Sequence, residues 1–162
     1  MLIVLRKDKK MDVYTVSLFG HREIGDIIRL EKKLFPMIKE LLRSHAYISF
    51  LIGRNGEFDE CAAAVIRRVR KEMGAENSEL LLILPYKMAK MEEYEAYYDG
   101  IIIPDCLHEA HPKSAITGRN RWMVEQANLV LAYVEHQKGG AYTAVRYAQK
   151  KNKAVINLCE NT

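Results

Sequence analysis

Short apolar runs alternate with longer stretches whose apolar residues recur at helical spacing, and this rhythm restricts the fold more than any other feature. The runs are rich in β-branched and aromatic residues, which is typical of strands, whereas the stretches between them predict amphipathic helices. The predicted strands are residues 13–19, 47–52, 79–84, 100–103, 128–134 and 154–158. The predicted helices are residues 27–42, 57–73, 87–97, 114–127 and 140–151, with Pro36 either kinking the first helix or starting a second one.

This alternation predicts one α/β domain. Strands that read as nearly continuous apolar runs are covered on both faces. Right-handed crossovers then place helices on both sides of the sheet. We therefore expect a Rossmann-like, doubly wound, mostly parallel sheet with helices on both faces. The 162 residues suffice for one such domain, with its core at about 12–159 and a short N-terminal extension at 1–11. Within that extension, Met11 is an alternative start, and residues 1–5 are an alternative edge strand.

Composition narrows the class of protein. Twenty-five Lys and Arg against 21 Asp and Glu give a net charge of +4, which is too small by itself to indicate a nucleic-acid binder. The three cysteines are far apart and form no CxxC pair, which argues against a disulfide framework and fits a reducing compartment. No apolar run approaches the ~18 residues that span a bilayer. We expect a cytoplasmic protein without a membrane partner.

The loops that follow the predicted strands hold most of the glycine. In doubly wound sheets, ligands bind beyond the carboxyl ends of the strands, where the strand order reverses. Glycines in these loops let backbone N–H groups approach an anion. Six of the nine glycines are placed in this way: Gly20, Gly25, Gly53, Gly56, Gly139 and Gly140.

Two standard phosphate motifs are incomplete. Gly20 and Gly25 have the spacing of a P-loop, but Asp26 and Ile27 follow where Lys and Ser or Thr are required. The first strand is also not followed by a G-x-G-x-x-G segment, which disfavours ordinary dinucleotide binding.

The segment after the fifth strand is a better phosphate site. Gly139 and Gly140 open a helix, and Thr143 adds a hydroxyl donor one turn later. The positive end of the helix dipole favours a phosphate at such a position. Arg119, on the preceding helix, is the natural clamp because its guanidinium fork suits phosphate.

Four short motifs at the predicted strand ends resemble the SLOG superfamily, which contains the Smf/DprA DNA-processing proteins and the LOG-type, lysine decarboxylase-like proteins. The motifs are Phe19–Arg22, Gly56–Asp59 with Ala62 and Ala63, Arg119–Arg121, and Gly139–Ala144 with Ala148. The first two resemble the YpsA-like branch. The resemblance runs from about Val13 to Leu158, and it implies a Rossmann-like fold that binds nucleotides or nucleotide-derived ligands.

The chain departs from the LOG-type enzymes at one catalytic position. These enzymes cut the N-glycosidic bond of a nucleoside monophosphate with a glutamate on the helix after the glycine pair. That glutamate falls at Val145 or Arg146 here. The resemblance therefore implies a retained phosphate site without the family carboxylate, and we lean against an enzyme. Glu57, Asp59 and Glu135 are the carboxylates on neighbouring loops that could substitute.

Four other features have two interpretations each. His21 and Asp59 form either an acid/base pair or, as we favour, a phosphate donor and a helix cap. Three aromatic residues either stack on a nucleotide base or pack in the core, namely Phe58, Tyr86 and Tyr142. Residues 105–111 are rich in metal-ligating types but lack HExxH spacing and a second ligand pair, so we expect no metal. The basic run at residues 67–71 is expected to be a solvated helix face rather than a DNA-binding surface.

We therefore expect a nucleotide-binding or nucleotide-derivative-binding protein that acts as a sensor or binding module and requires no cofactor. The alternatives are a nucleoside-monophosphate N-glycosidase and a single-stranded DNA-binding protein of the Smf/DprA type. A homo-oligomer is compatible with the sequence, and nucleic acid is the less favoured partner. The expected ligand-binding residues are Gly20, His21, Arg22, Gly53, Asn55, Phe58, Asp59, Tyr86, Arg119, Gly139, Gly140, Tyr142 and Thr143.

Overall fold

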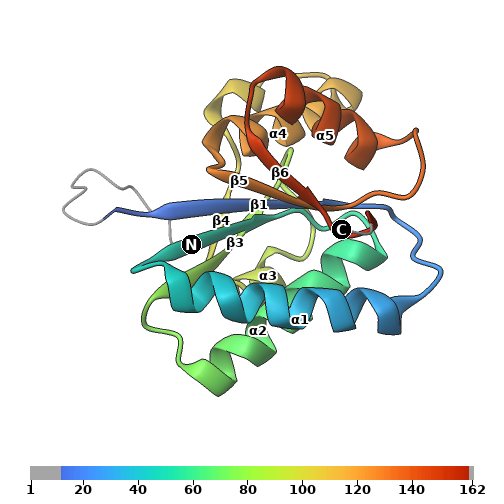
Figure 1. Ribbon diagram of the computed structural model, residues 1–162. Coiled ribbons are helices and arrows are strands. Elements are labelled where there is room, and N and C mark those ends of the chain that lie inside the picture. Colours follow the sequence, from blue (N-terminus) through green and yellow to red (C-terminus); the bar gives the residue numbers. More distant parts are fainter. Residues whose placement is uncertain (1–11, 161–162) are drawn as a thin grey trace.

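The computed structural model describes residues 12–160, so the alternatives for residues 1–11 lie outside the described residues. Its elements follow the expected alternation (Figure 1). The strands are β1 (Tyr14–Gly20), β2 (Ile48–Ile52), β3 (Ser78–Ile83), β4 (Gly100–Ile102), β5 (Leu129–Tyr133) and β6 (Ala154–Asn157). The helices are α1 (Ile27–Ser44), α2 (Glu57–Met73), α3 (Met91–Tyr97), α4 (Pro112–Gln126) and α5 (Gly140–Lys150), with a 3-10 turn at Asp105–Leu107.

The six strands form one parallel sheet in the order β4-β3-β2-β1-β5-β6. The order runs outward from β1 to β4 and then restarts with β5 on the other side of β1. The switch point therefore lies between β1 and β5, where Gly20 pairs with Tyr133 at the carboxyl ends. This is the doubly wound, Rossmann-like α/β fold that the sequence predicts.

Helices cover both faces of the sheet: α1 and α2 pack on one, and α4 and α5 on the other (Figure 1). The strands supply both cores because successive side chains point to opposite faces. In β1, Val16 and Leu18 belong to the α1–α2 core, whereas Phe19 belongs to the α4–α5 core. Ser17 points toward α4 as well, and its hydroxyl donates to the Met123 carbonyl at 2.7 Å.

Two predicted helices differ from the structure. Pro36 lies inside the single helix α1, so no second helix begins there. The predicted helix over 87–97 is helical only from Met91, and none of the residues of α3 is buried. Met91, Tyr94 and Tyr97 are only half-buried against the α1–α2 core, and so narrow a packed face stabilises few extra turns.

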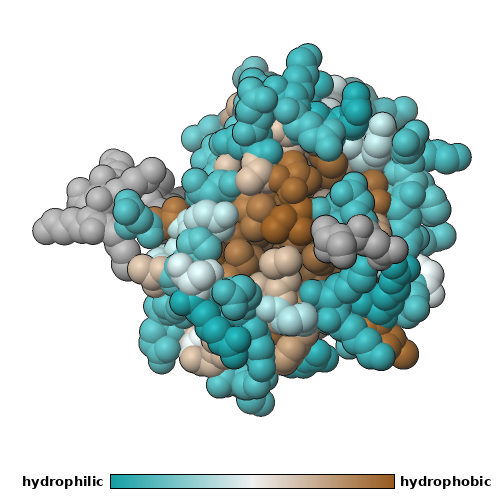
Figure 2. All heavy atoms as spheres, in the orientation of Figure 1, coloured by the Kyte–Doolittle hydropathy of each residue, from teal (hydrophilic) through white to brown (hydrophobic). Residues whose placement is uncertain are grey.

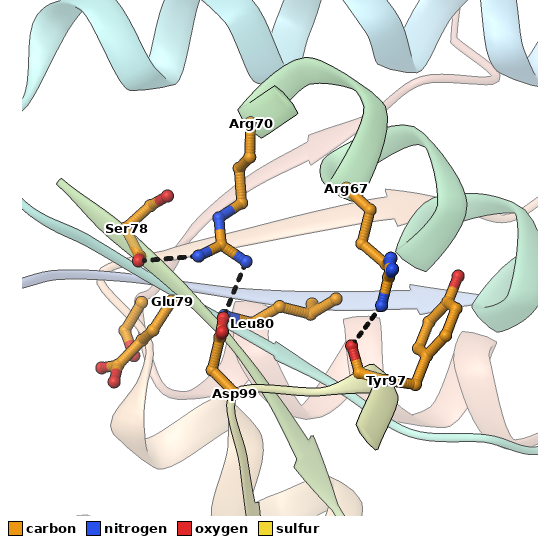
Figure 3. Close-up of polar contacts among 8 residues, drawn as sticks. Arg67, Arg70, Ser78, Glu79, Leu80, Tyr97 and Asp99 are labelled. Carbon is orange, nitrogen blue, oxygen red and sulfur yellow. Dashed lines mark hydrogen bonds and ion pairs between the residues drawn. The ribbon is translucent and has the colours of Figure 1, made fainter. Parts of the chain in front are cut away.

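Two arginines of the basic run join α2 to the β3–β4 side of the sheet (Figure 3). Arg70 donates to Asp99 at 2.7 Å and to the Ser78 carbonyl at 3.2 Å. Arg67 donates to the Tyr97 carbonyl at 2.6 Å, with its guanidinium over the Tyr97 ring. Arg67 is exposed, as the prediction of a solvated helix face requires, whereas the Arg70 side chain is only 13% exposed and binds the sheet side instead.

The surface between the two helix layers is apolar where β6 forms the edge of the sheet (Figure 2). Ile156 on this strand is 38% exposed. The surface over α5 on the same face is mainly hydrophilic (Figure 2). Across residues 12–160, no helix combines the length and apolarity needed to cross a membrane.

Candidate functional site

A cavity of about 380 Å³ lies at the carboxyl ends of the strands, beside the β1–β5 switch point. Its walls come from the loops after β1 and β2, from α4, and from the start of α5. The predicted site residues that line it are Gly20, His21, Arg22, Gly53, Asn55, Asp59, Arg119, Gly139 and Gly140. The topology thus brings together residues that lie up to 120 positions apart in the sequence.

Arg119 is the most unusual residue in the wall because it is charged and only 2% exposed. Its Nε donates to Asn120 Oδ1 at 2.8 Å and its Nη1 donates to the Ile83 carbonyl at 3.0 Å. With the Asn55 amide in the orientation that satisfies its neighbours, Nη2 donates to Asn55 at 2.6 Å. These bonds engage three of the five N–H groups of a guanidinium, so two are available to a ligand.

Gly53 makes room for this guanidinium. A Cβ at position 53 would lie 2.8 Å from Arg119 Nη1, which is closer than real Cβ contacts allow. Gly53 follows β2 directly, and Ile83 ends β3, so the buried cation sits against the carboxyl ends of two neighbouring strands. The predicted clamp is therefore held rigidly from three sides.

The charge of Arg119 is not neutralised by a close carboxylate. Among the ion pairs within 4.0 Å in residues 12–160, none involves Arg119. Burial lowers its pKa from the usual value, and the nearby charges of Asp59 and Tyr86 oppose that shift. Arginine nevertheless stays charged in proteins, so the cavity wall carries a buried cation.

Asp59 is the carboxylate that lines the cavity. Its Oδ2 accepts from the backbone N–H of Asn55 at 2.9 Å, so it ties the loop before α2 to the helix, but no side chain caps the first turn of α2. Burial raises the pKa of Asp59 to about 6, although the Asn55 hydrogen bond and the charge of Arg119 lower it. Asp59 therefore changes its charge within a pH range that is easy to study.

The start of α5 forms the far side of the cavity. Gly139 has a φ of +94°, a backbone conformation that favours glycine, and no side chain caps this helix end. The first N–H groups of a helix lack partners within the helix and attract anions. The hydroxyl of Thr143, however, donates to the Gly139 carbonyl at 3.0 Å, so it is engaged within the first turn of α5 and does not line the cavity.

His21 connects the loop after β1 to the loop after β5. Its Nε2 accepts from the backbone N–H groups of Glu135 at 2.9 Å and His136 at 3.1 Å, and its ring stacks on His136. Burial, followed by the charge of His136, lowers the pKa of His21, whereas Glu135 opposes the shift. An Nε2 that accepts cannot also donate, so only Nδ1 remains for a ligand, and no hydrogen bond joins His21 to Asp59 within the described chain.

The three predicted stacking residues lie elsewhere. Phe58 is fully buried and packs so tightly on Gly20 that a Cβ there would collide with its ring. Tyr86 is 39% exposed and is not part of the cavity wall. Tyr142 lines a separate cavity beyond β5 and β6. None of these three residues lies in the cavity wall, whereas Phe19 at the end of β1 does.

Sequence reasoning missed one side of the wall. Ile116, Asn120 and Met123 line the cavity together with Arg119. They belong to the same face of α4 because residues three and four apart are neighbours on a helix. Their recurrence every three or four residues along α4 is the sequence signal that could have identified them. Of these three residues, Asn120 matters most for the candidate site, because its Oδ1 also accepts from Arg119 Nε and so orients the guanidinium.

The remaining candidate residues, from the catalytic position on α5 and the metal-ligating segment, lie outside the cavity wall. Val145 is buried on α5 against the sheet, and Arg146 is exposed on the same helix. Asp105 and His108 lie 3.4 Å apart on the exposed 3-10 turn. Across residues 12–160, no three His, Cys, Asp or Glu residues are arranged to hold a metal ion.

The raised pKa of Asp59 predicts how anion binding depends on pH. Sulfate keeps its charge between pH 5 and pH 7.5, whereas Asp59 is mainly neutral at pH 5 and ionised at pH 7.5. We expect sulfate to bind about tenfold more tightly at pH 5, because the repelling carboxylate is protonated. Isothermal titration at both pH values measures the ratio. The Asp59→Asn variant should lose most of it, and an unchanged ratio in that variant would contradict the assignment.

No protein-family model and no curated protein sequence matches the chain. Two solved structures share its fold. DNA processing protein A (DprA) from Streptococcus pneumoniae superposes with a TM-score of 0.65 at 14% identity, over 88% of this chain and 49% of that one. DprA from Helicobacter pylori superposes with a TM-score of 0.60 at 16% identity, over 88% of this chain and 63% of that one.

The chain thus corresponds to about half of one DprA protein and under two thirds of the other. At these identities the similarity shows a shared fold, which in this chain is Rossmann-like. The expected resemblance is therefore confirmed at the level of the fold.

Proposed function

We propose that the chain binds a nucleotide or nucleotide derivative by its phosphate at the β1–β5 switch point, as a sensor or binding module. The observation that carries this proposal is the buried Arg119 guanidinium in the wall of the cavity. A buried cation is costly unless an opposite charge compensates it. Its hydrogen-bond partners are neutral oxygens, and no carboxylate in residues 12–160 lies within ion-pair distance of it, so a bound anion would supply the directly paired charge.

The other walls suit a phosphate attached to a small organic group. Gly139 and Gly140 leave the first turn of α5 open to an anion opposite Arg119. The cavity volume of about 380 Å³ lies within the range of small-molecule sites. Leu18, Phe19 and Met123 add apolar wall against which the organic part can pack.

A thermal-shift panel tests this proposal. We expect nucleoside 5′-monophosphates to raise the midpoint of unfolding, because a ligand that binds only the folded state stabilises it by mass action. The matching nucleosides lack the phosphate and should produce a much smaller shift. Equal shifts with nucleosides and nucleotides, or no shift with either, would contradict phosphate recognition.

An N-glycosidase is the alternative with a chemical basis, since Asp59 lines the cavity and could act as its carboxylate. We nevertheless predict little or no cleavage of AMP, GMP, CMP or IMP. Cleavage passes through a cationic sugar that a carboxylate stabilises, and α5 offers Val145 and Arg146 where the LOG-type enzymes have glutamate. Release of free base is the measurement. Turnover above about 0.1 per second, modest beside the typical ~10 per second of enzymes, would overturn the prediction.

Single-stranded DNA is the second alternative, because the H. pylori DprA structure describes a single-stranded DNA binding mode. The net charge of +4 and the internal contacts of Arg67 and Arg70 make it the less favoured function here. Oligonucleotide affinity that falls steeply with salt would favour it.

A further inference from the structure

A second, larger groove of about 840 Å³ runs between α4 and α5. Ile116, Asn120 and Gly140 line both this groove and the cavity at the switch point. The groove is therefore continuous with the candidate phosphate site and begins at the first residue of α5.

The groove is basic along its length. Arg121, Arg146 and Lys150 line it, and its lining contains no Asp or Glu. Arg121 also lies over the ring of Tyr147, and the Tyr147 hydroxyl donates to Glu125 at 3.1 Å, outside the lining. The charge of this surface is thus complementary to an anion.

The basic residues lie at increasing distance from the first site. At 1.5 Å per helical residue, Arg146 and Lys150 are roughly 9 Å and 15 Å along the axis from Gly140. They are four residues apart and so share one face of α5. A nucleotide whose phosphate lies at Gly140 and whose sugar and base fill the cavity at the switch point leaves Arg146 and Lys150 free for a further phosphate-bearing unit.

We propose that the α4–α5 groove receives the second phosphate-bearing unit of a dinucleotide whose first phosphate binds at Arg119 and Gly140. This inference rests on the proposed function, since the groove continues the same site. The first nucleotide occupies the cavity, and the second lies along α5 with its phosphate near Arg146. The lining ends at Lys150, the last residue of α5, which matches a ligand of two units rather than a long strand.

The test compares ligands that differ by one unit. The 5′-monophosphates of adenosine, guanosine, cytidine and uridine are titrated beside the corresponding 5′-phosphorylated homodinucleotides, with affinity read by calorimetry. We expect at least one dinucleotide to bind ten times or more tighter than its monomer. In Arg146→Glu this ratio should fall to near one. In Lys71→Glu, which makes the same charge change on exposed α2, the ratio should remain.

Four outcomes overturn the inference, the last of them together with the proposed function. If the unaltered protein binds the monophosphates but binds the dinucleotides no more tightly, the groove does not receive a second unit, and the proposed function still stands. An undiminished ratio in Arg146→Glu also rejects it. Affinity that keeps rising from dinucleotide to hexanucleotide identifies a single-stranded nucleic-acid surface instead. Absence of binding by all eight ligands rejects the proposed function itself.

Discussion

Replacing Arg119 with methionine is expected to weaken binding of a nucleoside monophosphate by at least about thirtyfold. Removing one partner of a buried charged contact typically costs about 2–5 kcal/mol, and tenfold in affinity is about 1.4 kcal/mol. Arg119 is buried and held by three hydrogen bonds, so a ligand meets a preorganised cation. Methionine fills a similar volume but offers no donor. Isothermal titration of the variant measures the loss.

The same substitution should leave the free protein folded. Methionine removes the cost of a buried cation, and Asp59 can take up a proton once Arg119 is gone. We expect the midpoint of unfolding to change by less than about 8 °C, which corresponds to about 2 kcal/mol in a chain of this length. Arg43→Met, at the exposed end of α1, is the matched control and should retain full affinity. Equal affinities for both variants would show that Arg119 does not contact the ligand.

Gly140→Asp is expected to reduce phosphate affinity by roughly thirtyfold to a hundredfold. The new carboxylate stands at the first residue of α5, where it competes with the ligand for the positive end of the helix. At an effective dielectric constant near 20, two like charges about 5 Å apart repel by roughly 3 kcal/mol. Calorimetry with the best ligand of the nucleotide panel measures the effect.

Gly140→Ala separates charge from bulk in this experiment. A Cβ at position 140 meets only Asn120 Nδ2 at 3.6 Å, an ordinary contact, so alanine fits without strain. Alanine should bind within about threefold of the unaltered protein. An aspartate at a helix start also favours the dipole, so Gly140→Asp should not lose stability. If alanine and aspartate weaken binding equally, bulk explains the effect and the anion site is misplaced.

The fold was predictable because its signal is periodic. Continuous apolar runs identified the strands, and α2 begins and ends at the residues that its helical spacing and Gly74 indicate. The short α3 was overpredicted, since a polar pattern does not reveal whether a helix finds a packing partner. Pro36 left two alternatives open because a proline in a helical pattern either ends or bends the helix, and tertiary packing on α1 decides which.

The candidate site was predictable in its location but not in its hydrogen bonds. Strand-end glycines and the rule for switch points indicated the cavity. The sequence could not show that Arg119 reaches the Ile83 carbonyl 36 residues away, or that His21 accepts from the loop after β5. Phe58 was a candidate for base stacking, and only packing against Gly20 places it in the core. Such contacts depend on three-dimensional neighbours that no local pattern encodes.

A crystal structure with a bound nucleoside monophosphate tests the central claim most directly. We expect a phosphate oxygen to accept hydrogen bonds from the Arg119 guanidinium and from backbone N–H groups at the start of α5, within about 3.2 Å. Such a complex would place the ligand at the β1–β5 switch point. A nucleotide bound elsewhere, with only water between Arg119 and Gly140, would contradict it.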